Sequence, residues 1–311
     1  MTKGATLVVG VVSGLLALAC MAGHLACQVG WDDETDFAVP PIYVSIVVHN
    51  EESAHYHDNP QRFVEERTAL VDFVNMLVDN DVKLNWQSDW TFLRAIQLHD
   101  QGYNTGGANI AQYIVDCGFE VDPHAHESQY NYADVAYLLD AIGVSPSTVA
   151  GGFIAYPPEN CLLEQFWQPI TSTIDPAYSW TAEVLWGGGT SNHVDEEDLW
   201  ASGIWKPQDN ENFMTHDGSA PIAHIGKFGN TWEDLDRLIE YQQEGELYWN
   251  HLYTATVFVR QADLTGPNFT SDFEQDLQLR KGAGNLEWVG LGELFGIWEN
   301  DYNSNATQLF Y

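Results

Sequence analysis

Short β-branched runs alternate with stretches of helical periodicity along most of this chain, and this alternation limits the fold more than any other feature of the sequence. Strands that alternate with helices form a parallel sheet with right-handed crossover connections. The runs predict strands at 43–48, 82–86, 119–122, 148–153, 182–186, 222–225 and 253–259. Helices are predicted after Asn59-Pro60 and Ser88-Asp89 and over 110–117, 133–142, 232–243 and 273–279.

About seven strand–helix units in one mid-sized domain favour a distorted (β/α) barrel over an open doubly wound sheet. The stretch 154–220 has few helix signals and is rich in Trp, Gly and Pro. We therefore expect an α/β barrel of about seven parallel strands, with long loops over its C-terminal face.

The first residues have the pattern of an export signal. Lys3 precedes an apolar run from Ala5 to Ala19, which is shorter than a membrane span and has the length of a signal-peptide core. We predict a signal peptide at 1–19, a tether at 20–41 and a folded domain at 42–311. Cys20 follows the small residues directly and Cys27 is a second candidate, so lipoprotein processing and simple cleavage both stay open. We expect an exported protein, either an envelope lipoprotein or a secreted or periplasmic one.

The charge of the chain limits its partners. There are 45 Asp and Glu residues against 11 Lys and Arg residues, a formal net charge of -34. Such a surface repels phosphate backbones and anionic headgroups, so we expect no nucleic-acid partner and membrane contact only through a lipid anchor. We interpret the excess charge as a solvated exterior.

Two cysteines, Cys117 and Cys161, lie beyond the leader, and we expect no disulfide between them. Cys117 ends a helix that leads into the strand at 119–122, whereas Cys161 follows the strand at 148–153. They therefore lie on opposite faces of the predicted barrel, which are separated by roughly 15 Å. A disulfide needs Cα atoms within about 7 Å of each other.

Polar residues follow the predicted strands instead of preceding them. In parallel α/β folds the C-terminal ends of the strands form the functional face. That face would collect His49 and Glu51 after the first strand, Gln87 and Asp89 after the second, and the segment 122–126 after the third.

The segment Asp122-Pro-His-Ala-His126 is the sharpest local signal. In an extended chain, residues two apart project to the same side, so the imidazoles of His124 and His126 would point into the barrel mouth together. Two such imidazoles suit zinc or a similar divalent ion. His49 is the first choice for a third ligand and Asp122 the second. The alternative is a pair of loop histidines bonded to backbone groups.

Further side chains at the mouth are candidates for catalysis and substrate binding. Glu51 is a candidate general base, although a strand-end hydrogen-bond network explains it equally well, and His193 is a candidate proton donor in the long loop. Flat indole faces can stack on sugar rings, although much of this tryptophan must also build the core. The predicted substrate-binding residues are Trp86, Trp90, Trp186 and Trp205.

At these residues the chain resembles the polysaccharide deacetylase superfamily, over roughly residues 42–300. The resemblance is carried by VVHNEE (47–52), NWQSDW (85–90) and GFEVDPHAHE (118–127). It implies a distorted barrel that hydrolyses N- or O-acetyl groups on sugars, with a divalent metal, a carboxylate base and a histidine acid. The sequence departs from the family in two places. His49-Asn50-Glu51 replaces paired aspartates, and the two histidines of 124–126 lie closer together than is usual.

Three functions are consistent with these residues. The first is a metal-dependent hydrolase that removes acetyl or similar amide or ester groups from an extracellular polysaccharide. The second is a metal-independent glycoside hydrolase that uses two carboxylates such as Glu51 and Asp122. The third is a sugar-binding surface lipoprotein without catalysis.

Overall fold

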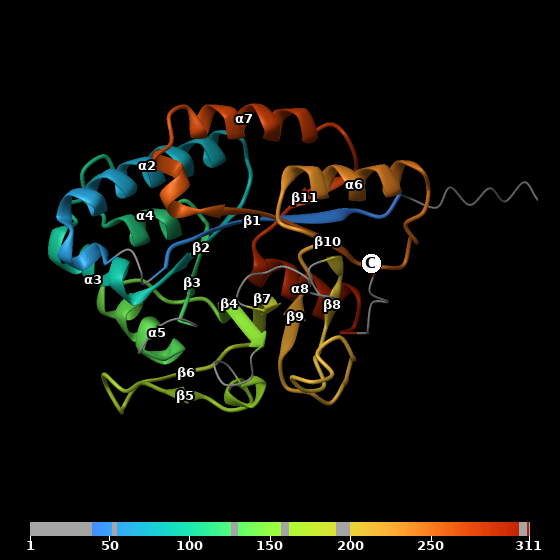
Figure 1. Cartoon of the computed structure of the whole chain (residues 1–311), viewed down its shortest axis with the longest axis horizontal. Helices are drawn as coiled ribbons and strands as arrows, with labels where there is room; N and C mark the ends of the chain where they lie inside the picture. The colour runs from blue at the N-terminus through green and yellow to red at the C-terminus, as the bar shows by residue number, and fades with distance from the viewer. Residues whose placement is uncertain are drawn as a thin grey trace, which may run out of the picture. The chain divides into compact units, whose positions relative to one another are not determined.

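The computed structural model of the chain describes residues 39–51, 55–125, 130–156, 162–190, 200–304 and 310. Seven strands within these residues match the seven predicted ones, with boundaries that differ by a few residues (Figure 1). They are β1 (Ile42–His49), β2 (Leu84–Ser88), β3 (Glu120–Pro123), β4 (Val149–Tyr156), β7 (Val184–Thr190), β9 (Ala223–Ile225) and β10 (Tyr253–Arg260).

The predicted helices are also present in the described part of the chain. They are α2 (Pro60–Asp79), α3 (Trp90–His99), α4 (Ile110–Asp116), α5 (Tyr132–Ala141), α6 (Trp232–Gln243) and α7 (Phe269–Arg280). Their starts follow the local capping chemistry, because the side chains of Asn59, Asp89 and Asn109 each accept a backbone N–H of the first turn. Figure 1 shows α2, α6 and α7 on one side of β1, with α8, β7, β8 and β9 on the other.

The strands form two parallel groups. One sheet has the order β10-β1-β2-β3, and another has β4-β7-β9 with the short antiparallel strand β8 (Ile204–Trp205) at its edge. A parallel bridge between His124 and Gly151 connects β3 to β4. On the other side, the Thr256 N–H donates to the Lys227 carbonyl at 2.7 Å and links β10 to the segment after β9. The α/β barrel of parallel strands is therefore confirmed.

The stretch after β4 contains little helix, as predicted. It holds the 3-10 helix η3 (Leu163–Phe166) and a small hairpin of β5 (Ile170–Thr171) and β6 (Ser179–Trp180). The segment after β5 packs on the start of α5, where Asp134 accepts hydrogen bonds from Ser172 and Thr173.

Two clusters of apolar side chains form the core of the described chain. A large apolar cluster lies between the sheet and the outer helices, and a second one joins β1, β4, β7 and β9 to the last helix. That helix is α8 (Leu291–Asp301), whose Leu291, Leu294 and Trp298 are fully buried.

Helix α8 and the strand before it, β11 (Leu286–Trp288), were not predicted from the sequence. The reason is that the helix has no local N-cap: its N-cap residue is Gly290, which has no side chain to accept a hydrogen bond. The cap comes from distant strands. Glu120 of β3 accepts the N–H of Gly292 at 2.8 Å, and Asn85 of β2 accepts the N–H of Leu291 at 2.8 Å.

The predicted leader and most of the predicted tether lie outside the described residues, so both stay predictions. Cys117 carries a free thiol, and Cys161 also lies outside the described residues. Within the part of the chain that the structure describes, no helix combines the length and the apolar character needed to cross a bilayer.

Candidate functional site

Two histidines meet at the C-terminal ends of the barrel strands. His49 is the last residue of β1, and His124 follows directly after β3. Their ring centroids lie 4.9 Å apart with 15° between the ring planes, and the residues are 4 % and 2 % exposed. We call these two residues the histidine pair. The structure thus brings the rings of His49 and His124 together, while their predicted role as metal ligands stays a prediction.

Hydrogen bonds determine which ring nitrogen of each histidine carries the proton. The Nδ1 atom of His124 lies 2.9 Å from the Asn50 carbonyl oxygen. A carbonyl oxygen only accepts, so Nδ1 donates, and in a neutral imidazole the ring lone pair then lies on Nε2. This arrangement, with one ring nitrogen bonded to a backbone carbonyl, is the usual one for histidines that bind metals.

His49 has a carboxylate beside it. Its Nε2 lies 3.2 Å from Oε1 of Glu51, whose side chain is 41 % exposed. Its Nδ1 is buried and has no hydrogen-bond partner among the described residues. The edge of Phe258 contacts the same ring, with 4.4 Å between centroids. An imidazole held by a carboxylate, with one buried nitrogen available, is ready to bind a further group.

Asp122, on β3, precedes His124 by two residues and is fully buried. Its carboxyl accepts hydrogen bonds from Asn85 at 2.9 Å, Ser147 at 2.6 Å and Gln87 at 3.4 Å. Burial raises its pKa to about 8, and the nearby Glu120 adds to the rise. Through these hydrogen bonds the carboxyl bridges β2, β3 and the segment just before β4.

The donor atoms present fit a divalent metal in part. The histidine pair supplies two imidazole rings, and Glu51 supplies a carboxylate close by. Among the described residues, no group of three or more His, Cys, Asp or Glu side chains is placed to hold a metal ion. His126, the other predicted ligand, lies outside the described residues, as does His193. Both stay predictions.

The four predicted sugar-binding tryptophans occupy different surroundings. Trp86 and Trp205 are fully buried in the core and present no ring face to a substrate in this structure. Trp186 is 3 % exposed and donates to Thr256 at 3.3 Å. Trp90 is half-buried, next to the rings of His57 and Tyr130, and is the most accessible of the four.

Sequence reasoning missed two amide residues that build the site. Asn50 supplies the carbonyl that orients His124, and Gln261, the first residue of the 3-10 helix η5 (Gln261–Thr265), is bonded to the Asn50 side chain at 3.1 Å. Asn50 lies between His49 and Glu51, so its position at the strand end was a usable signal. Gln261 had no signal, because its partners are distant in the sequence.

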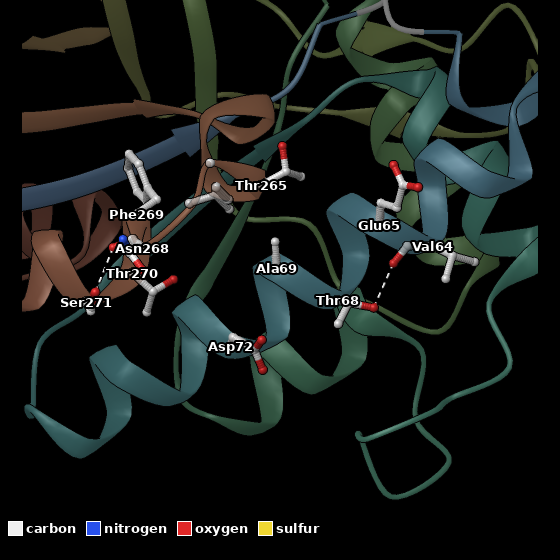
Figure 2. A pocket seen from close by; sticks show the side chains of 12 residues that line it. Val64, Glu65, Thr68, Ala69, Asp72, Thr265, Asn268, Phe269, Thr270 and Ser271 are labelled. Atoms are coloured by element: carbon white, nitrogen blue, oxygen red, sulfur yellow. Dashed lines mark hydrogen bonds between the residues drawn. The ribbon is translucent and has the colours of Figure 1, made fainter.

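Cavities also occur away from the histidine pair. One of about 800 Å³ lies between α2 and the segment from η5 into α7, and Figure 2 shows Glu65, Thr68 and Asp72 on one of its walls. Thr265 and Phe269 lie on the opposite wall. None of the predicted site residues lines this cavity. The chemistry predicted from the sequence is therefore not located there.

Solved structures show what the fold is similar to. The chain aligns with a protein assigned as a polysaccharide deacetylase from Pseudomonas aeruginosa PAO1, with a TM-score of 0.54 and 10% identity over 85% of this chain and 93% of that one. A second such protein, from Mycobacterium smegmatis, aligns with a TM-score of 0.50 and 8% identity over 88% of this chain and 94% of that one. The fold is deacetylase-like. An allantoinase, PuuE, aligns at a TM-score of 0.49 with 10% identity, over 84% of this chain and 91% of that one.

No protein-family model matches the sequence, and no curated protein matches it. At identities of 8–10% the likeness to the solved structures shows the fold alone. The chemistry has to be argued from the residues of this chain.

Proposed function

We propose that this protein is a metal-dependent hydrolase that removes acetyl groups, held by amide or ester bonds, from a polysaccharide outside the cell. The observation that carries the proposal is the histidine pair, with centroids 4.9 Å apart at the strand ends of a deacetylase-like barrel. The Asn50 carbonyl supports it, because a backbone carbonyl bonded to the other ring nitrogen is the usual orienting partner of a metal-binding histidine.

In this proposal His49 and His124 hold the ion, together with His126 from the segment that follows. Imidazole ligands suit zinc among other divalent transition metals, and zinc is the ion that we propose. When bound, a divalent ion polarises the acyl carbonyl and makes water more acidic.

The remaining roles belong to groups that move protons. Glu51 is half-exposed beside His49, so its carboxylate can accept the proton of the attacking water. His193 is the proposed donor to the leaving amine or alcohol. Asp122 is fully buried under three hydrogen-bond donors, which suits it to hold β2 and β3 in place better than to meet a substrate.

That burial also disfavours the glycoside hydrolase alternative. A glycosidase needs two carboxyl groups that flank the scissile bond. Glu51 lies at the mouth, whereas Asp122 is 0 % exposed and already bonded to its neighbours. The sugar-binding alternative without catalysis remains an outcome of the test below.

The test measures acetate release and metal content together. Purified protein is incubated with acetylated oligosaccharides, one series with N-acetyl groups and one with O-acetyl groups, and its bound metal is measured by elemental analysis. Acetate release that a chelator abolishes and zinc restores supports the proposal. Cleavage of the glycan chain in the presence of the chelator supports a glycosidase, and glycan binding without turnover supports a binding protein.

The proposed location follows from the predicted leader. We propose that the protein is exported and that it is either released or held by a lipid on Cys20 or Cys27. Mass spectrometry of the exported protein tests this. A mature N-terminus beyond residue 19 is expected, and a protein that retains Met1 contradicts it.

A further inference from the structure

We infer that Gln261 is a positioning residue that holds His124, by way of Asn50, in its metal-binding tautomer. The inference rests on the proposed function insofar as it concerns a metal. Its structural basis is a chain of buried hydrogen bonds that runs from the ring of His124 through Asn50 to Gln261.

The first step of the chain is the Asn50 residue. Its carbonyl oxygen accepts the Nδ1 proton of His124 at 2.9 Å. For that bond to persist, the Asn50 peptide has to keep its orientation at the end of β1. The N–H of Asn50 donates to the Gln87 carbonyl at 3.2 Å, but the Asn50 carbonyl belongs to the next peptide, so its orientation also depends on the bonds of the Asn50 side chain.

The second step is the Asn50 side chain, which is 3 % exposed. Its Oδ1 accepts the Asp89 N–H at 3.0 Å, and its Nδ2 donates to Oε1 of Gln261 at 3.1 Å and to Ser88 at 3.4 Å. Asp89 and Ser88 both lie at the end of β2. Of the three bonds, the one to Gln261 connects Asn50 to a different element, η5.

The third step is Gln261 itself, which is fully buried. Its Oε1 also accepts Trp86 Nε1 at 2.8 Å, and its Nε2 donates to Glu66 of α2 at 3.2 Å. Glu66 in turn accepts from Tyr56 at 2.6 Å. Three separate elements thereby fix both ends of the Gln261 amide, so it cannot rotate without breaking buried bonds.

The consequence is that the amide of Gln261 presents a fixed acceptor to Asn50, and Asn50 presents a fixed acceptor to His124. Removing the amide takes away one of the three hydrogen bonds of the Asn50 side chain, so the Asn50 carbonyl is held less firmly toward the ring. The proton of His124 can then move to Nε2, which blocks the lone pair that the metal needs. Loss of an outer partner of this kind typically lowers metal affinity about 10- to 100-fold.

The test compares two buried glutamines. Gln261→Met keeps the length of the side chain and removes the amide. Gln242→Met is the matched control, because Gln242 is also buried and makes three hydrogen bonds, to Pro40 and Asn285 near the start of β1. Both variants should lower the melting temperature. Only Gln261→Met should weaken Zn²⁺ binding to the full-length protein, about 10- to 100-fold by titration calorimetry.

A second readout follows the tautomer directly. Two-bond ¹⁵N–¹H correlation spectra of the metal-free protein should show His124 with its proton on Nδ1, and Gln261→Met should move it in part to Nε2. If Gln261→Met fails to fold, Asn50→Ala takes its place, since it removes the same bond to Gln261 and keeps the backbone carbonyl.

The outcomes separate this inference from the proposed function. Zn²⁺ affinity in Gln261→Met equal to that of the parent overturns the inference, and so does an equal loss in Gln242→Met. If the parent binds no Zn²⁺, the proposed function fails, and the tautomer spectra alone decide. In that case a proton that stays on Nδ1 in both the parent and Gln261→Met overturns the inference, and its redistribution in Gln261→Met upholds it.

Discussion

Buried histidines occur in two regions of this barrel, and the regions use them in opposite ways. The histidine pair lies at the ends of β1 and β3, where a carboxylate and a backbone carbonyl bond one nitrogen of each ring. His224 lies in β9 and is 0 % exposed, yet neither of its ring nitrogens has a hydrogen-bond partner within the described part of the chain. Its ring packs against Trp205 and Phe213, with centroids 4.5 and 4.9 Å away.

The difference shows that burial of an imidazole does not by itself mark a functional site. Side chains alternate along a strand, so the neighbours of His224, Ala223 and Ile225, join the cluster shared with β1 and α8, while His224 points to the other face of β9. There it meets aromatic rings and acts as an apolar filler. His49 and His124 instead lie where parallel strands end, and a carboxylate and a backbone carbonyl orient their rings.

The largest expected effect is the loss of Zn²⁺ binding when a histidine of the pair, but not His224, is replaced. His124→Ala should lower Zn²⁺ affinity by at least about a hundredfold and abolish acetate release, because it removes one of the proposed ligands. His224→Leu should leave both unchanged, since that ring touches only the core. Titration calorimetry and acetate assays on both variants check this. A loss of zinc from His224→Leu together with a well-folded spectrum would reverse our assignment of the two regions.

The second-largest expected effect tests whether Glu51, beside the histidine pair, acts as a general base or as a metal ligand. Glu51→Gln keeps the size of the side chain and removes its ability to take a proton. We expect turnover to fall by about 10²- to 10⁴-fold with Zn²⁺ affinity nearly unchanged. The control is Glu65→Gln, an exposed glutamate on α2, which should keep full activity. A Glu51→Gln protein that loses zinc would make Glu51 a ligand instead.

Most of the barrel could be predicted from the sequence because its information is local. Each of the seven strands is a β-branched or apolar run, and the helices α2, α3 and α4 begin at Asn or Asp caps that are visible in the sequence. Helix α8 escaped prediction because Glu120 and Asn85 cap it from about 170 to 210 residues away along the chain.

The site was predictable to the extent that it depends on strand ends. His49, Glu51 and His124 were found because polar residues that follow parallel strands gather at one face. Gln261 was not found, since its importance lies in bonds to Asn50, Trp86 and Glu66 that only the folded chain brings together. Trp86 and Trp205 were assigned to the substrate because composition cannot tell an indole of the core from one at the mouth.

A smaller effect concerns the pH dependence of stability. Burial lowers the pKa of His224 well below its usual 6.5, and the nearby Lys227 lowers it further. The unfolded chain therefore takes up a proton below pH 6.5 that the folded chain does not. This contribution to stability is complete above pH 6.5 and is lost as the pH falls, by up to about 1.4 kcal/mol per pH unit. Denaturant unfolding of His224→Leu between pH 5 and 7.5 should show a shallower loss than the parent. Equal slopes would mean that His224 is protonated in the folded state.

The smallest expected effect compares one buried indole from each region. Trp205, beside His224, donates to the Phe213 carbonyl at 2.6 Å, and Trp86 donates to Gln261 at 2.8 Å. Replacing either by Phe removes one N–H from a buried acceptor, which should lower the free energy of unfolding by about 1–2 kcal/mol. The two acceptor residues have different neighbours. Phe213 packs against His224 in the core, whereas Gln261 is hydrogen-bonded to Asn50 beside the histidine pair. Trp205→Phe should therefore lose stability and keep the parent's Zn²⁺ affinity, as chemical denaturation and calorimetry on the same preparation can show. A Trp205→Phe protein with weakened zinc binding would mean that the two histidine regions are energetically coupled, and the contrast between them would no longer hold.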